Sequence, residues 1–190
     1  MSVLDWIAAA FAFILLAIPL YWFILHPFAS FWRTKPVQLA FAVAATVAWG
    51  ISLLVMLALG SRPFAISDPP FVFKILGVVL LLGEVLMMRQ VLSAMGPERL
   101  AGKMELSGMR ELQVSGVYAY VRHPSYAGMM GAMLGVCLLA WSAEMWVLGI
   151  IWFLAMRLMI ALEERELIAR FGEQYVEYQR KVPAFLPYRF

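Results

Sequence analysis

Five apolar stretches separated by short polar segments dominate the chain. A helix that crosses a bilayer needs about 20 mostly apolar residues, so stretches of this kind predict membrane helices. The predicted helices are Val3 to Leu25, Val37 to Gly60, Phe71 to about Met95, Ser125 to Trp141 and Met145 to Leu162. Only the segment 142–144 separates the last two, which predicts a tight helical hairpin. The pattern therefore predicts an all-α integral membrane bundle of about five transmembrane helices.

The composition excludes an ordinary soluble domain and a disulfide-rich scaffold. Of the 190 residues, 64% are hydrophobic and 14% are charged, whereas a typical soluble domain has about 25% charged residues. Cys137 is the single cysteine, so the chain cannot form an intrachain disulfide. We expect a single domain over residues 1–190, with three N-terminal transmembrane helices in 1–95 and the chemistry in 96–190.

The distribution of basic residues predicts the orientation in the membrane. If five helices alternate in direction, thirteen of the 15 lysines and arginines fall on one side. Positively charged loops stay in the cytoplasm, so we expect the N-terminus outside and the C-terminus in the cytoplasm. The net charge of +3 then indicates attraction to anionic lipid headgroups and does not indicate nucleic-acid binding.

Polar residues that could bind a ligand or take part in a reaction lie just before the fourth predicted helix. Arg122 and His123 precede Pro124, which suits the first turn of a helix. The free amides of that turn favour an anion, and Ser125 and Tyr126 add donors and acceptors. The structural alternative is an interfacial anchor with a belt of tyrosines.

A second polar group ends the fifth predicted helix. Arg157, Glu163 and Glu164 follow a long apolar run. Ionisable residues at membrane depth tend to face a partner or a wet cavity. The alternative is a solvated helix end, with Arg157 extending to the headgroups. The two histidines, His26 and His123, stand apart, so the sequence predicts no metal site.

The order and spacing of several blocks resemble the isoprenylcysteine carboxyl methyltransferase family of integral membrane enzymes. The wider group includes phospholipid N-methyltransferases and small-thiol methyltransferases. The similarity covers roughly residues 103 to 188. The matching blocks are Gly116-Val117-Tyr118, Arg122-His123-Pro124-Ser125-Tyr126, Glu163-Glu164, Phe171-Gly172-Glu173-x-Tyr175-x-Glu177-Tyr178 and Val182-Pro183-x-x-Leu186-Pro187.

The resemblance implies S-adenosylmethionine as methyl donor, with S-adenosylhomocysteine as product. A cytoplasmic loop and the C-terminal tail would form the cofactor pocket. The implied cofactor-binding residues are Lys103, Arg110, Glu111, Leu112, Gln113, Tyr118, His123, Pro124, Ser125, Tyr126 and Glu163. Counting from Phe171 selects Glu163 for the cofactor ammonium group, and counting from Tyr126 selects Glu164, so both stay open.

Arg157 and Glu164 are the candidate catalytic residues, with one departure from the family. The family has an arginine four residues before the cofactor glutamate, where this chain has Met159. Arg157 lies two residues earlier, which rotates it about 200° around the helix. This departure leaves the chemical class of the methyl acceptor open.

The resemblance implies carboxyl O-methylation of a lipophilic acceptor. Phospholipid N-methylation and thiol S-methylation on the same scaffold are the alternatives, and a non-enzymatic transporter or assembly protein is the alternative of another class. The implied partners are a lipophilic small-molecule, lipid or prenylated acceptor and membrane lipids, without nucleic acid. The sequence leaves the oligomeric state open and is typical of a prokaryotic cytoplasmic membrane protein. Glu84 and Arg89 either line the acceptor site or have structural roles. In the structural alternative, Arg89 marks the cytoplasmic end of its helix and Glu84 faces a neighbouring helix.

Overall fold

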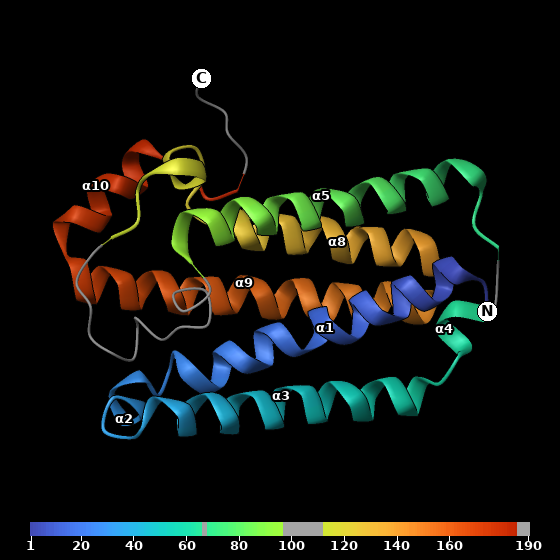
Figure 1. The fold of residues 1–190 in the computed structure, drawn as a ribbon, viewed down its shortest axis with the longest axis horizontal. Coiled ribbons are helices and arrows are strands. Elements are labelled where there is room, and N and C mark those ends of the chain that lie inside the picture. Colours follow the sequence, from blue (N-terminus) through green and yellow to red (C-terminus); the bar gives the residue numbers. More distant parts are fainter. Residues whose placement is uncertain (66–67, 97–111, 186–190) are drawn as a thin grey trace.

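Five long helices run alongside one another in the computed structural model, which describes residues 1–65, 68–96 and 112–185 (Figure 1). They are α1 (Val3–Leu25), α3 (Val37–Leu59), α5 (Phe71–Met95), α8 (Pro124–Ala140) and α9 (Ala143–Phe171). Short helices complete the described chain: α2 (Ala29–Trp32), α4 (Arg62–Ala65), the 3-10 helix η1 (Gly116–Ala119) and α10 (Glu173–Lys181). The described residues include four helices long and apolar enough to cross a membrane, α1, α3, α5 and α9, and the shorter apolar α8. The predicted all-α membrane bundle is confirmed.

Local signals explain where the helices begin and end. Ser2 and Asp5 form a capping box at the start of α1, and the Ser142 hydroxyl accepts the Met145 N–H at the start of α9. The backbone of Gly172 ends α9 with a φ of 58°, which glycine adopts at little cost. The bounds of α1 and α5 match the prediction, whereas α9 continues nine residues beyond the predicted Leu162.

The extension of α9 has a physical reason. Its apolar run ends near Leu162, but the next turns remain helical, with Glu166 Oε1 3.9 Å from Arg170 Nη1 four residues later. The end of an apolar run shows where the chain leaves the hydrocarbon core, and the helix itself can continue beyond that point. At 1.5 Å per residue the helix is about 43 Å long, whereas the hydrocarbon core is about 30 Å thick. The C-terminal turns of α9 therefore extend out of the core.

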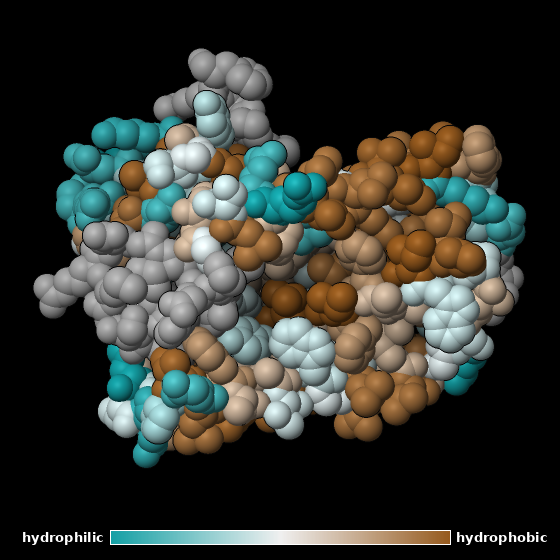
Figure 2. All heavy atoms as spheres, viewed as in Figure 1, coloured by the Kyte–Doolittle hydropathy of each residue, from teal (hydrophilic) through white to brown (hydrophobic). Residues whose placement is uncertain are grey.

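The polar end of the bundle is visible on its surface. Figure 2 shows apolar atoms over the right-hand part of this face and a concentration of hydrophilic atoms at the left end, where α10 lies. Large apolar side chains such as Leu54, Leu57 and Leu154 are exposed on the outer helices, as expected for contact with lipid. Arg33 Nη2 lies 2.7 Å from Glu166 Oε1, so the loop after α1 and the end of α9 are at the same end of the bundle.

Helix α8 packs against α5 through glycines. A Cβ atom on Gly77 would lie 2.7 Å from Leu139 Cγ and 3.0 Å from the Gly135 carbonyl oxygen. One on Gly135 would lie 2.9 Å from the Gly77 carbonyl oxygen. Small residues at such an interface allow two helix backbones to approach closely in a membrane. On its other side, α8 places Cys137 against Gly149 of α9, which forms the predicted hairpin.

We expect Gly77→Ala to destabilise the bundle by about 1–3 kcal/mol, because the added methyl group has no space between α5 and α8. Gly83→Ala on the same helix is the matched control, since nothing lies within 4 Å of its added Cβ. The control should stabilise the protein slightly through helix propensity. Thermal unfolding of both variants in detergent checks this. Equal midpoints for the two would show that the glycine contact is not tight.

Candidate active site

A carboxylate shared by two cationic or polar partners lies at the polar end of the bundle. Arg122 donates from Nη2 and Nε to Glu164 Oε1, at 2.8 and 3.2 Å. His123 Nε2 lies 3.0 Å from the same oxygen. Arg122 and His123 come directly before α8, and Glu164 comes from the last third of α9. Two segments that are 41 residues apart in the chain therefore meet at one atom.

The C-terminal tail is fastened over this cluster. Arg122 donates from Nη1 to the Val182 carbonyl oxygen at 2.5 Å and to that of Gln179 at 3.2 Å. The backbone N–H groups of residues 122 and 123 donate to the carbonyl oxygens of 183 and 184, at 2.8 and 3.0 Å. Arg122 thus connects the loop, α9 and the tail through a single guanidinium group, whose fixed fork of donors suits this geometry.

Aromatic rings enclose the imidazole of His123, which is 4% exposed. Tyr126 stacks on it with ring centroids 5.6 Å apart, and Phe185 of the tail lies 6.1 Å away. Tyr178 of α10 donates its hydroxyl to the Tyr118 carbonyl oxygen at 2.6 Å. Burial raises the pKa of Tyr178 to about 12, although the charge of Arg122 acts in the opposite direction. The phenol therefore stays a donor at physiological pH.

Glu163 belongs to the same cluster. Its Oε2 lies 3.9 Å from His123 Nδ1, on the other side of the imidazole from Glu164. Burial raises the pKa of Tyr118, and the negative charge of Glu163 adds to that effect, which indicates that the phenol and the carboxylate are neighbours. The cluster thus holds two adjacent carboxylates, one guanidinium, one imidazole and several aromatic rings.

A cavity of about 690 Å³ adjoins the cluster from the membrane side. Ser125 and Tyr126 line it, and Tyr126 is also the residue that stacks on His123. The other walls come from α1, α3 and α5 and are mostly apolar. Their residues include Phe11, Ile18, Trp22, Phe41, Trp49 and Met88, and Met129 of α8 adds to them. A polar cluster and an apolar chamber of ligand size therefore share a wall.

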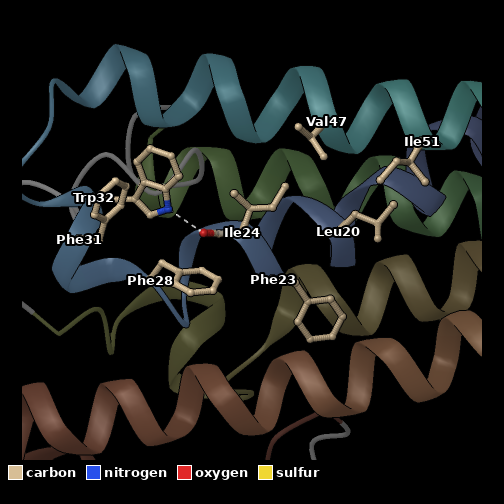
Figure 3. A pocket seen from close by; sticks show the side chains of 8 residues that line it. All are labelled: Leu20, Phe23, Ile24, Phe28, Phe31, Trp32, Val47 and Ile51. Carbon is tan, nitrogen blue, oxygen red and sulfur yellow. Dashed lines mark hydrogen bonds between the residues drawn. The ribbon is translucent and has the colours of Figure 1, made fainter.

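A second cavity, of about 520 Å³, has no comparable chemistry. It is lined from α1, α2 and α3 by apolar and aromatic side chains only (Figure 3). The single polar atom of its aromatic residues, Trp32 Nε1, donates to the Ile24 carbonyl oxygen at 2.7 Å. This cavity offers apolar contact and no group that could take part in a reaction.

Comparison with known proteins identifies the family. The family model described as phospholipid methyltransferase matches residues 72–174, which is more than half of the chain. The chain belongs to the phospholipid methyltransferase family. The match includes nearly all of α5 and the whole of α8 and α9, together with the segment that carries Arg122 and His123.

Curated relatives match less than half of this phospholipid methyltransferase family member. A protein-S-isoprenylcysteine O-methyltransferase of Xenopus laevis is 38% identical over 92 residues, which is 44% of this chain and 30% of that protein. The Schizosaccharomyces pombe protein of the same name is 39% identical over 79 residues, 40% of this chain and 33% of that protein. Methanethiol S-methyltransferase 1 of Bradyrhizobium diazoefficiens is 36% identical over 78 residues, 38% of this chain and 25% of that protein.

The chain spans about a third or less of the length of these relatives. No solved structure shows a significant match to the chain. The resemblance inferred from the sequence blocks is confirmed by the family match and by the methyltransferase relatives. Because every relative named here is a methyltransferase, the similarity implies a methyl donor.

The structure brings together more than half of the site residues that the isoprenylcysteine carboxyl methyltransferase blocks imply. Those that meet in the cluster or its shared wall are Tyr118, His123, Pro124, Ser125, Tyr126, Glu163 and Glu164. Leu112 and Gln113 are half-buried before η1, and Gln113 donates to the Ser115 hydroxyl at 3.0 Å. Lys103, Arg110 and Glu111 lie outside the described residues.

Arg157, a predicted catalytic residue, is not part of the cluster. Its side chain is exposed on α9, whereas Met159 two residues later is fully buried. The rotation expected from a two-residue shift therefore places the arginine on the outer face of the helix. Within the described chain, the basic residue that meets the carboxylates is Arg122.

Arg122 is also the residue whose role in the site the sequence reasoning missed. The sequence placed it either in a polar group at the start of a helix or in an anchor at the membrane surface, and Arg122 was not among the predicted site residues. The signal that could have found it was the pair of glutamates at the end of α9, which needs a buried cation nearby. Its guanidinium is only 12% exposed.

Proposed function

We propose that this chain is an S-adenosylmethionine-dependent methyltransferase that acts on a lipophilic acceptor at the membrane. The observation that carries the proposal is the shared wall between the Arg122–His123–Glu164 cluster and the apolar cavity. A methyl transferase for lipophilic acceptors needs a polar site for the donor and an apolar site for the acceptor, side by side. The names of the relatives agree with this chemistry.

The residues of the cluster fit the chemical groups of the donor. The carboxylates of Glu163 and Glu164 suit its ammonium group and ribose hydroxyls, and Arg122 suits its carboxylate. The rings of Tyr118 and Tyr126 can face a sulfonium cation. When bound, the donor supplies an activated methyl group and leaves as S-adenosylhomocysteine. The chain itself holds the two reactants in line and, through the tail and its aromatic rings, excludes water.

The acceptor would enter from the bilayer into the apolar cavity. Among acceptor chemistries, carboxyl O-methylation is favoured by the isoprenylcysteine O-methyltransferase relatives, and S-methylation by the methanethiol S-methyltransferase relative. A carboxylate or thiolate is already nucleophilic, so neither requires a strong base from the protein. Base treatment of a product labelled with tritiated methyl groups separates the two, because methyl esters hydrolyse and thioethers do not.

The orientation belongs to the same proposal. The loop after α1, the end of α9 and α10 share the polar end of the bundle, and most basic residues of the described part of the chain belong to these segments. With this end in the cytoplasm, as the distribution of lysine and arginine predicts, the donor reaches the cluster from the cytoplasm. The N-terminus then lies outside.

We expect S-adenosylhomocysteine to bind the protein in nanodiscs, and His123→Ala to weaken that binding by about tenfold or more. The imidazole is buried between two carboxylates and two aromatic rings, so its loss disturbs the whole cluster. Isothermal titration calorimetry measures the affinity. The control is Glu144→Gln, which changes an exposed carboxylate at the α8–α9 turn. Absence of binding by folded wild-type protein would overturn the proposal in favour of a transport or assembly role.

A further inference from the structure

Glu84 is a buried carboxyl group in the middle of a membrane helix. It lies on α5 and is 7% exposed. Its Oε2 atom has no hydrogen-bond partner among the described residues. Burying a polar atom without a partner costs several kcal/mol in an apolar environment, and ionisable residues inside a membrane usually serve a function.

The carboxyl group of Glu84 occupies space that α8 leaves free at Gly128, which has no side chain. Glu84 Oε2 lies against the backbone of Gly128, where a Cβ atom would collide with it. Glu84 Cδ and Met87 Cβ would each be 3.2 Å from that Cβ atom. Gly128 is thus the residue that makes room for the carboxyl group one turn after Pro124, at the start of α8. A carboxyl group kept only for helix packing would be expected to have a partner on that neighbouring helix.

Glu84 also lines the large cavity. Glu84 and Arg89 are the charged residues among those that line it, and Arg89 is exposed whereas Glu84 is not. Ser125 and Tyr126 line the same space and belong to the wall shared with the His123 cluster. The buried carboxyl group of this mostly apolar chamber therefore lies close to the proposed donor site.

We propose that Glu84 binds the head group of the acceptor, which carries a hydrogen-bond donor, most favourably an amine. This inference rests on the proposed function and names the acceptor class: an amphiphile with a long apolar chain and a protic head. The apolar walls take the chain, and the carboxyl oxygen of Glu84 accepts the N–H or O–H of the head. The head group is then held beside Tyr126. An atom of the acceptor that lies next to the head group and receives the methyl group would face the donor. Glu84 is thus a specificity-determining residue.

Native mass spectrometry of the detergent-solubilised protein tests the assignment with three probes of equal chain length: dodecylamine, dodecanol and dodecyl methyl ether. Wild-type protein should bind the amine about tenfold or more tighter than the ether, with the alcohol between them, because hydrogen bonds to charged groups are stronger than neutral ones. Glu84→Leu should bind all three about equally. Glu84→Gln should keep the alcohol and lose the preference for the amine.

Two further variants separate binding from structure. Gly128→Ala should displace the carboxyl group and remove the amine preference while Glu84 is still present. Gly131→Ala is the matched control, since its Cβ would be in ordinary contact with Leu80 Cδ2 at 3.7 Å. Both Glu84 variants should keep the thermal midpoint of the wild type or exceed it, because they remove an unpartnered buried carboxyl group.

The outcomes distinguish this inference from the proposed function. If Glu84→Leu keeps the amine preference, or if its midpoint falls and the preference is lost only with the fold, the assignment of Glu84 is overturned. S-adenosylhomocysteine affinity should stay within about twofold of wild type in the Glu84 variants, since no donor contact is changed. Protein that selects the amine but does not bind S-adenosylhomocysteine would retain the Glu84 site and reject the methyltransferase proposal.

Discussion

The variant Arg122→Leu is expected to lose S-adenosylhomocysteine binding and about 3 kcal/mol of stability. The guanidinium supplies Glu164 with two hydrogen bonds and the carbonyl oxygens of Gln179 and Val182 with two more. Removing one partner of a largely buried ion pair leaves the other charge uncompensated. Thermal unfolding in detergent measures the stability, and calorimetry measures the binding.

Two comparisons make the Arg122 result specific. Arg122→Lys keeps the positive charge but not the fork of donors, so its effect should lie between those of wild type and leucine. Arg180→Leu removes another arginine of the same region. Arg180 forms an ion pair with Glu173 in which each of the two side chains is 70% exposed. An exposed ion pair contributes little, and this control should behave like wild type. If Arg122→Leu and Arg180→Leu behaved alike, the central role of Arg122 would be excluded.

The two neighbouring glutamates should respond differently to the same change. Glu164→Gln removes the charge that Arg122 and His123 share, so we expect both a lower thermal midpoint and weaker S-adenosylhomocysteine binding. Glu163→Gln should weaken binding by about 10- to 100-fold, because a charged hydrogen bond to the ammonium group is lost. Its midpoint should change much less, since the pair that holds the tail stays intact. Calorimetry and thermal unfolding on both variants measure this split.

The reverse pattern would reassign the cofactor ligand. If Glu163→Gln binds normally while Glu164→Gln binds weakly at an unchanged midpoint, Glu164 contacts the donor and Glu163 does not. Glu166→Gln provides the control on the same helix, because its carboxylate pairs with Arg33 and Arg170 away from His123. This variant should keep the binding of the wild type.

Local patterns predicted the helices well, because each depends on neighbours in the chain. Apolar runs predicted the bounds of α1 and placed those of α5 at Phe71 and about Met95, as the structure has them. The order of polar blocks also identified His123, Tyr126 and the glutamate pair as parts of one site. His123 and Tyr126 lie at the start of α8, and the glutamates follow the end of the apolar run of α9, so a sharp change in hydrophobicity marks both places in the sequence.

What could not be predicted depends on contacts between distant segments. Arg122 meets Glu164 and Val182, which are 42 and 60 residues away, and no local period reports such a pairing. The direction of Glu84 required knowledge of which residue of α8 lies opposite, and that residue proved to be Gly128. The position of Arg157, in contrast, could be predicted from spacing along a single helix. A shift of two residues turns its side chain away from the face that carries Met159, as the structure shows.

The length of α9 makes the reaction zone sensitive to the thickness of the bilayer. The helix enters at the Ser142 turn on one side and carries Glu163 and Glu164 about 30 Å further along its axis, near the opposite edge of the hydrocarbon core. In a thinner membrane the carboxylates rise into the headgroups, and in a thicker one they approach the acyl chains, unless the helix tilts. The lipid composition around the protein thus sets how far an amphiphile must move to bring its head group level with the methyl donor.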